Sequence, residues 1–373
     1  MAKLKNFLKK KDIVLSGKRY GIDALGAMAQ GLFCTLLVGT ILNTLGQQLN
    51  IGFLNAVIAT VGKGEGAVSY TIGGLASAMV GPGIAVAIGF ALNAPSLVLF
   101  SLIPVGFATN AMGGAGGPLA VYFVAILATE LGKVVSKETK VDILVTPIVT
   151  ILAGVGFAAL VAAPIGTAAN AVGQAIMWAT ELQPLLMGIV VSVLVGIALT
   201  LPISSAAICA SFGLVGLAGG AAVAGCCAQM IGFAVMSFKE NRWGGLVAQG
   251  LGTSMLQMPN IVKNPKIWIP PIVVSAITGP LATCVFKLKM NGLAVNSGMG
   301  TCGLCGQIGI WTGWVSPSAD ALKAGEVAIT PGVMDWTGLV LICFVLPAVL
   351  TPIFCHILRK IGWIKENDLK LAL

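Results

Sequence analysis

The sequence predicts an all-α, polytopic integral membrane protein with about eight to ten transmembrane helices and one or two re-entrant hairpins. Two observations predict this class. The 373 residues are 57% hydrophobic and 9% charged, with a mean hydropathy of +0.96, whereas soluble domains carry about 25% charged residues. Apolar runs of about 20 residues, the length at which a helix crosses a bilayer, recur along the chain. The composition therefore excludes a soluble or peripheral protein.

The two ends of the chain carry much of its net charge of +9. Basic residues flanking membrane spans face the cytosol, so we expect both termini in the cytosol. We expect three parts: residues 1–20 as a basic amphipathic helix on the inner leaflet, residues 21–358 as a single transmembrane domain, and residues 359–373 as a short basic tail. The basic residues are not interleaved with aromatic ones, so nucleic acid is not an expected partner.

Residues 251–271, which read LGTSMLQMPNIVKNPKIWIPP, are polar although they lie between apolar runs. We call this segment the polar block. Each of its polar groups needs a protein or water partner at membrane depth, so the block either lines a cavity or forms a loop outside the membrane. We favour a cavity-lining hairpin, because polar residues and helix breakers alternate with Met and Leu along its whole length.

Two further stretches have polar residues at informative positions. In LTLPISSAA (199–207), Pro202 interrupts an apolar run beside two serines, as in transporter helices that are broken at a midplane site. In 163–184, polar residues recur near helical spacing and predict one polar face. The Gly-rich stretches 107–118 and 293–309 are better explained as loops or close helix contacts. The candidate solute-binding residues are therefore Ser254, Gln257, Asn260, Thr253, Asn170, Gln174, Ser204 and Ser205.

The few titratable residues argue against several activities. We interpret Glu130 and Lys133 as a snorkelling salt bridge at a helix end. A chain of buried carboxylates is lacking, which argues against an ion-coupled carrier or channel and for a neutral polar solute. One histidine, His356, leaves no nucleophile–base pair, so no catalytic residue and no cofactor are expected. The cysteines are interpreted as packing residues; Cys302 and Cys305 have redox spacing without a redox fold, and no metal site is expected.

The side of the membrane on which two basic loops lie stays open. Ten crossings would place both termini in the cytosol but the loops 238–244 and 263–266 outside, against the usual charge bias. Either one segment is re-entrant, or the charges of these loops serve a site.

The order of several blocks carries a family resemblance. ILVTPIVTILAGV, APIGTAANAVGQ, LLMGIVVSVLVGIALTLPISSAA and GLGTSMLQMPNIVKNPKIWIPP follow one another, after GKRYGIDALGAMAQGLF near the start. This succession resembles the membrane (EIIC) subunits of the bacterial phosphoenolpyruvate:sugar phosphotransferase system. The fructose/mannitol branch and a compact family that includes perfringolysin-O regulator-type proteins are the most similar. The resemblance runs from about Lys18 to the last apolar run. It implies a sugar-binding subunit, a homodimer and phosphate supplied by separate cytosolic phosphocarrier proteins.

One departure from the family pattern bears on the activity. Fructose-type subunits carry an Ile-Thr-Glu-Gly motif whose glutamate hydrogen-bonds the sugar, whereas the corresponding positions here read LGTSML, without a carboxylate. A carboxylate accepts strong hydrogen bonds from sugar hydroxyls and helps to polarise the one that is phosphorylated. The departure argues against phosphoryl transfer and leaves two hypotheses open. The chain is a transport subunit, at most the membrane component of a phosphotransferase, or a membrane sensor or regulator on the same scaffold.

Overall fold

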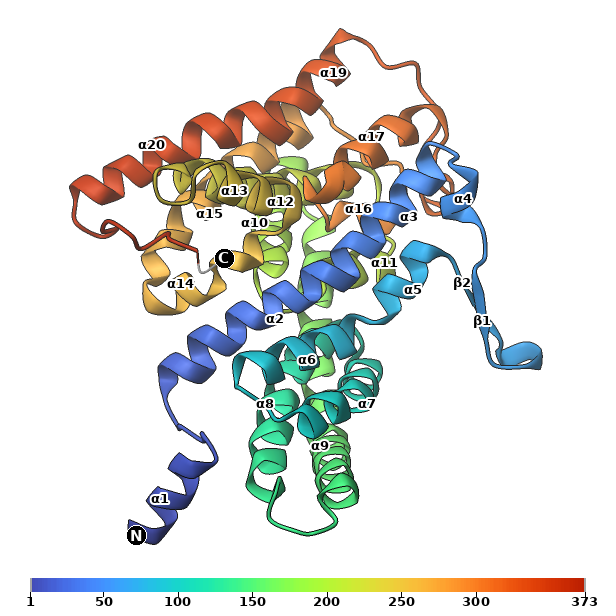
Figure 1. The fold of residues 1–373 in the computed structure, drawn as a ribbon. Coiled ribbons are helices and arrows are strands. Elements are labelled where there is room, and N and C mark those ends of the chain that lie inside the picture. The colour runs from blue at the N-terminus through green and yellow to red at the C-terminus, as the bar shows by residue number, and fades with distance from the viewer. Residues whose placement is uncertain (1, 372–373) are drawn as a thin grey trace. The chain divides into compact units, whose positions relative to one another are not determined.

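The chain folds almost entirely into helices. A computed structural model describes residues 2–371, which are shown in Figure 1. The structure is 78% helical, and its sheet is one small antiparallel hairpin in which Thr60 of β1 (Ala59–Val61) pairs with Ser69 of β2 (Val68–Tyr70). The predicted all-α class is confirmed.

Several helical segments can cross a membrane. Six described segments are long and apolar enough. A seventh span results if α5 (Ile72–Ala78) and α6 (Val80–Ala91), bent by 54° at their junction, cross as one broken helix. The protein is therefore an integral membrane protein. The six segments are Arg19–Gln48, Ser96–Val135, Asp142–Thr180, Gly216–Met236, Pro265–Val285 and Val333–Lys360.

This number is lower than the eight to ten spans predicted, and two elements account for much of the difference. The apolar helix α10 (Pro184–Thr200) is shorter than the length required of a span. The segment Ser96–Val135 counts once, although it contains two helices that pack against each other on either side of Gly114, where φ is +51°. The exact number of crossings and the re-entrant hairpins stay predictions.

The chain forms two compact units. The first comprises the residues up to Asn43 together with Gly52–Ala168. The expected transmembrane domain 21–358 includes most of both units, and its behaviour as one domain stays a prediction. The helices of the first unit are α1 (Ala2–Lys10), α2 (Leu25–Leu32), α3 (Val38–Gln48, which ends in the second unit), α4 (Gly52–Asn55), α5 (Ile72–Ala78), α6 (Val80–Ala91), α7 (Ser96–Gly113), α8 (Gly117–Val135) and most of α9 (Asp142–Thr180).

The second unit comprises Thr44–Ile51 and Ala169–Leu373. It contains α10, its packing neighbours α12 and α15, and several further helices. After α10 these are α11 (Ser205–Ser211), α12 (Gly216–Met236), α13 (Phe238–Val247), α14 (Met258–Lys263), α15 (Ile269–Pro280), α16 (Ala294–Ser297), α17 (Cys305–Val315), α18 (Ala319–Lys323), α19 (Val333–Val340) and α20 (Leu346–Lys360).

Small residues let the central helices of the second unit pack closely. Helices α10, α12 and α15 are mutual neighbours, and α20 packs on α12 and α15. A Cβ atom at Gly225 would overlap the carbonyl of Ser192, and one at Gly279 would overlap the carbonyl of Gly188. Larger side chains would force the backbones apart, so glycine acts here as a packing residue, as expected for helices in membranes.

Candidate functional site

The polar block folds into short pieces rather than one helix. A π-helical turn (Ala248–Gly252) ends at the extended residue Thr253, a 3₁₀ turn (Ser254–Gln257) leads into α14, and a second 3₁₀ turn (Pro265–Trp268) leads into α15. Side chains cap these pieces locally: Thr253 Oγ1 accepts from the Met255 amide (3.1 Å), and Asn264 Oδ1 accepts from the Lys266 amide (3.2 Å). Caps at such short spacing compete with a continuous helix.

The four candidate residues of the polar block are buried within the second unit. Ser254 and Gln257 are fully buried, and Thr253 and Asn260 nearly so. The Ser254 hydroxyl shares a hydrogen bond of 2.8 Å with the hydroxyl of Thr200. Thr200 is the last residue of α10, just before the interruption at Pro202. Two stretches singled out in the sequence therefore meet through a pair of buried hydroxyls.

Gln229, in the middle of α12, completes this cluster. Its Oε1 accepts hydrogen bonds from the Trp268 indole (2.9 Å) and from Thr200 Oγ1 (3.3 Å). Its Nε2 is buried and has no partner among the described residues. A buried amide donor without a partner is costly, so this group favours a bound polar molecule. We call Thr200, Gln229, Ser254 and Trp268 the hydroxyl–amide cluster.

The two serines after Pro202 join a third interrupted stretch. Ser204 caps α11 by accepting from the Ala207 amide, and the buried Ser205 hydroxyl donates to the carbonyl of Gly298 at 2.8 Å. Thr301 in turn donates to the carbonyl of Gly250 at 2.5 Å. The interruptions near residues 202, 250 and 300 are thus cross-linked by side chain-to-backbone hydrogen bonds, which the sequence did not reveal.

Asn170 and Gln174 lie elsewhere. Both are exposed on α9, and no interaction among the described residues links either side chain to the hydroxyl–amide cluster. Their role in solute binding stays a prediction without geometric support. The helical spacing of the two residues on α9 agrees with the polar face that the sequence predicted.

A second polar network covers the other side of the polar block. Gln249 Nε2 donates to Ser237 Oγ (2.9 Å), and its Oε1 accepts from Gln257 Nε2 (2.8 Å). Gln257 Oε1 then accepts from Asn260 Nδ2 (2.8 Å). The same two amide nitrogens also donate to main-chain carbonyls near the C-terminus, Gln257 to Leu369 (3.0 Å) and Asn260 to Lys370 (2.9 Å).

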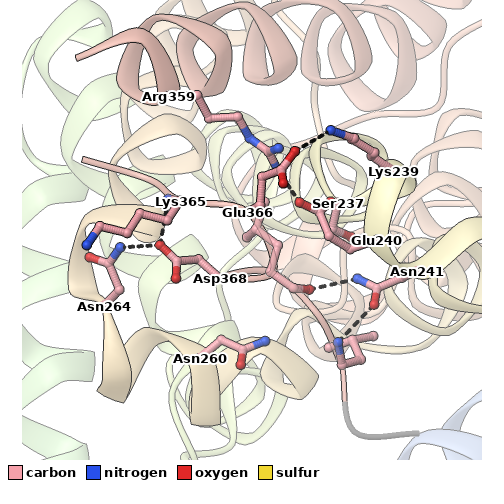
Figure 2. Close-up of polar contacts among 12 residues, drawn as sticks. Ser237, Lys239, Glu240, Asn241, Asn260, Asn264, Arg359, Lys365, Glu366 and Asp368 are labelled. Carbon is pink, nitrogen blue, oxygen red and sulfur yellow. Dashed lines mark hydrogen bonds and ion pairs between the residues drawn. The ribbon is translucent and has the colours of Figure 1, made fainter. Parts of the chain in front are cut away.

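The last residues of the chain therefore lie against the polar block. Figure 2 shows that Asn241 and Asn264 add further contacts: Asn241 Nδ2 donates to the Leu369 carbonyl (2.7 Å), and Asn264 Nδ2 donates to Asp368 (2.8 Å). We call residues 363–371 the C-terminal tail. It was predicted as a short basic tail, but its docking against residues 237–264 was not foreseen.

Charged pairs fix the same arrangement. Glu240 accepts from Arg359 at 2.5 Å, and Lys239 pairs with Glu366 at 2.8 Å (Figure 2). Lys266 lies over the Trp363 ring, 5.0 Å from its centroid. The loops 238–244 and 263–266 thus lie at the same end of the second unit as the C-terminal tail. The side of the membrane on which these loops lie stays open.

Amide residues missed by the sequence analysis dominate this region. Gln229 had a usable signal, since it is the lone amide residue in the apolar segment Gly216–Met236, and polar groups at membrane depth mark functional sites. Gln249 and Asn241 had none, because each depends on partners distant in sequence.

A cavity of about 420 Å³ lies at the N-terminal end of α10, the end opposite to Thr200, and is lined in part by Lys287 and Lys289.

All nine cysteines are free, and Cys302 and Cys305 are buried. Within residues 2–371, no three His, Cys, Asp or Glu side chains are grouped as a metal site.

The comparison with protein families identifies the chain. The family model described as "Phosphotransferase system, EIIC" matches residues 22–371. The chain therefore belongs to the EIIC family of the phosphotransferase system, whose members are membrane transport subunits for sugars that work with separate IIA and IIB components. Neither the curated proteins nor the solved structures include a significant match.

Proposed function

We propose that this chain is an EIIC-type transport subunit that binds a small neutral polar solute, a sugar or a related compound, in a midplane cavity lined by the polar block. One observation carries the proposal: three interrupted stretches converge in the second unit and enclose hydroxyl and amide side chains rather than charges. Hydroxyl and amide groups both donate and accept hydrogen bonds, as the hydroxyls of a sugar require. A neutral cluster also avoids the cost of burying an unpaired charge.

The proposed contacts come from two groups of residues. Gln229 Nε2 supplies a free donor, and Ser254 and Thr200 supply hydroxyls that can exchange their mutual bond for bonds to the solute. The half-buried Trp268 offers a ring face for an apolar face of the sugar. Gln257 and Asn260 extend the donor array. Ser204, Ser205 and Thr253 position the backbone of the interrupted stretches.

The missing glutamate limits the chemistry that we propose. Leu251, Gly252, Thr253 and Ser254 stand where fructose-type subunits carry their acidic motif. The carboxylate that would help to polarise the sugar hydroxyl for phosphoryl transfer is therefore missing from this motif. Any phosphate would come from separate phosphocarrier proteins, with this chain as solute-binding partner.

The location of the charges supports a topology. Lys239 and Lys266 contact the C-terminal tail at one end of the second unit. We propose that this end faces the cytosol of a bacterial cell at its inner membrane, that the N-terminus does so too, and that the protein is a homodimer.

Solute uptake tests the proposal. The full chain is reconstituted in proteoliposomes, and uptake of labelled fructose, mannitol and glucose is measured with and without cytosolic phosphocarrier proteins. Gln229→Leu should lower the affinity for the accepted solute about tenfold, because a donor is lost from a buried site. Gln30→Leu, at an exposed position of α2 in the first unit, serves as the control. Equal uptake by the wild type and Gln229→Leu would remove the hydroxyl–amide cluster from the site.

The second candidate function is a membrane sensor or regulator. Two observations favour it. The polar block has no carboxylate, and the main-chain carbonyls of the C-terminal tail accept hydrogen bonds from amide side chains of the polar block. Co-purification of one specific cytosolic partner, with no uptake of any solute, would support the regulator. Uptake without such a partner would support the transport subunit.

A further inference from the structure

We infer that the C-terminal tail is an intramolecular latch, which must leave the polar block before a solute or a partner protein can reach Gln257 and Asn260. The inference rests on the proposed function only for the identity of what enters after release. The docking of the tail and its release are properties of the chain itself.

The tail occupies side-chain donors through its main chain. The carbonyl of Leu369 accepts from both Gln257 Nε2 (3.0 Å) and Asn241 Nδ2 (2.7 Å), and the carbonyl of Lys370 accepts from Asn260 Nδ2 (2.9 Å). The Leu371 amide donates to Asn241 Oδ1 at 2.8 Å, so Asn241 binds the tail at both ends of its amide group (Figure 2). Side-chain amides thus bind the main chain of the tail next to its turn at residues 366–369.

Only two side chains of the tail are deeply buried. Ile364 and Leu369 have exposed fractions of 2% and 0%, while Lys365, Glu366, Asn367 and Lys370 are exposed. Two apolar anchors and a row of hydrogen bonds therefore hold a segment that contributes little else to the hydrophobic core. Segments with few buried apolar contacts open at lower free energy than core helices do.

The charged contacts of the tail also favour reversible docking. Lys239 and Glu366 are both mostly exposed, and exposed ion pairs contribute little net stability. Lys266 stacks on the exposed Trp363 in the same way. None of these contacts buries an unpaired charge when it forms or leaves one when it breaks.

The exchange of partners explains why such a latch suits this site. When the tail leaves, the Gln257, Asn260 and Asn241 amides lose carbonyl partners and need new acceptors. Hydroxyl oxygens of a polyhydroxylated solute, or main-chain carbonyls of a partner segment, provide the same hydrogen-bond chemistry. Ligand and tail thus compete for one set of donors, which couples binding to tail release.

The rate of cysteine modification tests the latch without knowledge of the solute. In a background with the exposed Cys34 and Cys284 changed to Ser, Asn260→Cys serves as reporter. Its labelling by a membrane-impermeant maleimide is measured in vesicles with the cytosolic face outward. Leu369→Asp places a carboxylate in an apolar position and should release the tail, raising the labelling rate roughly tenfold or more. Lys370→Asp, on the adjacent exposed position, is the matched control and should leave the rate within about twofold.

A cross-link provides the opposite test. With Lys239→Cys and Glu366→Cys, a short bifunctional maleimide should hold the tail in place even in the Leu369→Asp chain. An Asn260→Cys reporter, blocked reversibly during cross-linking, should then keep its slow labelling rate. Fast labelling in the cross-linked chain would overturn the latch. Equal labelling of Leu369→Asp and Lys370→Asp would overturn it as well.

Solute binding separates this inference from the proposed function. Binding of labelled fructose, mannitol and glucose is measured with Leu369→Asp and Lys370→Asp in detergent. Faster labelling together with tighter binding in Leu369→Asp supports both proposals. Faster labelling with no binding of any of the three supports the latch and contradicts sugar binding by the opened block. Unchanged labelling rejects the latch, whatever the binding data show.

Discussion

The two ends of the chain are tethered by different chemistry. The C-terminal tail docks on the second unit through neutral amide side chains that bind its main chain. Residues 11–20, which we call the N-terminal arm, dock on the first unit through charges. Arg19 binds Asp12 (2.6 Å) and the Leu92 carbonyl (2.7 Å). Lys133 of α8 donates to the carbonyls of Asp12 (2.7 Å) and Leu92 (2.9 Å).

Burial of the cation makes the N-terminal attachment the more permanent one. Lys133 is 1% exposed and lies 3.3 Å from Glu130, which also accepts from the Tyr20 hydroxyl. The i,i+3 pair expected from the sequence is confirmed, but snorkelling toward solvent was wrong, because the N-terminal arm covers the lysine. A buried cation whose partners leave is strongly disfavoured, whereas an amide can exchange one neutral acceptor for another. The comparison indicates a fixed N-terminus and a releasable C-terminus.

The largest expected effect comes from removal of the buried cation. Lys133→Met leaves the Glu130 carboxylate without its cation and the Asp12 carbonyl without its lysine donor, so we expect the first unit to lose about 3 kcal/mol of stability. Thermal unfolding in detergent measures the loss. Lys140→Met, on the exposed loop after α8, is the matched control. If both variants unfold at the same temperature, the N-terminal attachment is no stronger than a surface contact.

Acid should loosen the N-terminal arm at a defined pH. The hydrogen bonds from Arg19 hold the pKa of Asp12 down, from 3.8 to about 2. A carboxyl with a lowered pKa in the folded state stabilises it above the unfolded pKa, and this contribution disappears as the pH falls through the folded value. The protection of residues 11–19 against hydrogen exchange, measured relative to the intrinsic exchange rate at each pH, should therefore fall as the pH is lowered from 3.8 to about 2. In Asp12→Asn, residues 11–19 should be less protected at neutral pH, and the loss of protection at acid pH should be absent. If that loss remains, another carboxyl causes it.

The smallest expected effect concerns the exposed pair of the tail. The ion pair with Lys239 lowers the pKa of Glu366, but both groups are solvated, so Lys239→Ala should change the labelling rate of the Asn260→Cys reporter by less than about threefold. About 1 M salt, which screens charges beyond a few ångströms, should have an equally small effect. A large response to salt would mean that charges rather than amides hold the C-terminal tail, and the contrast between the two ends would be lost.

The sequence determined the class of protein and the local breaks in its helices. Composition and apolar run length fix membrane insertion, because both are sums over the chain. Pro202 follows the end of α10, and Pro259 and Pro265 stand in the first turns of short helical pieces. Thr253 and Asn264 cap such pieces, since proline geometry and short-range capping need only neighbouring residues. The sequence also indicated that protein must surround the polar block, because its polar groups cannot form hydrogen bonds with lipid.

Only the tertiary structure determined which groups become the hydrogen-bond partners of the buried polar side chains. Ser254 meets Thr200, Gln257 meets Leu369, and Lys133 meets Asp12, across separations of 54, 112 and 121 residues. No local pattern encodes such pairs, because a hydroxyl, an amide or an ammonium group accepts many partners of equal chemistry. The packing of α10, α12 and α15 selects among them by bringing particular backbones within reach. The site therefore depends on geometry that hydropathy and spacing leave undetermined.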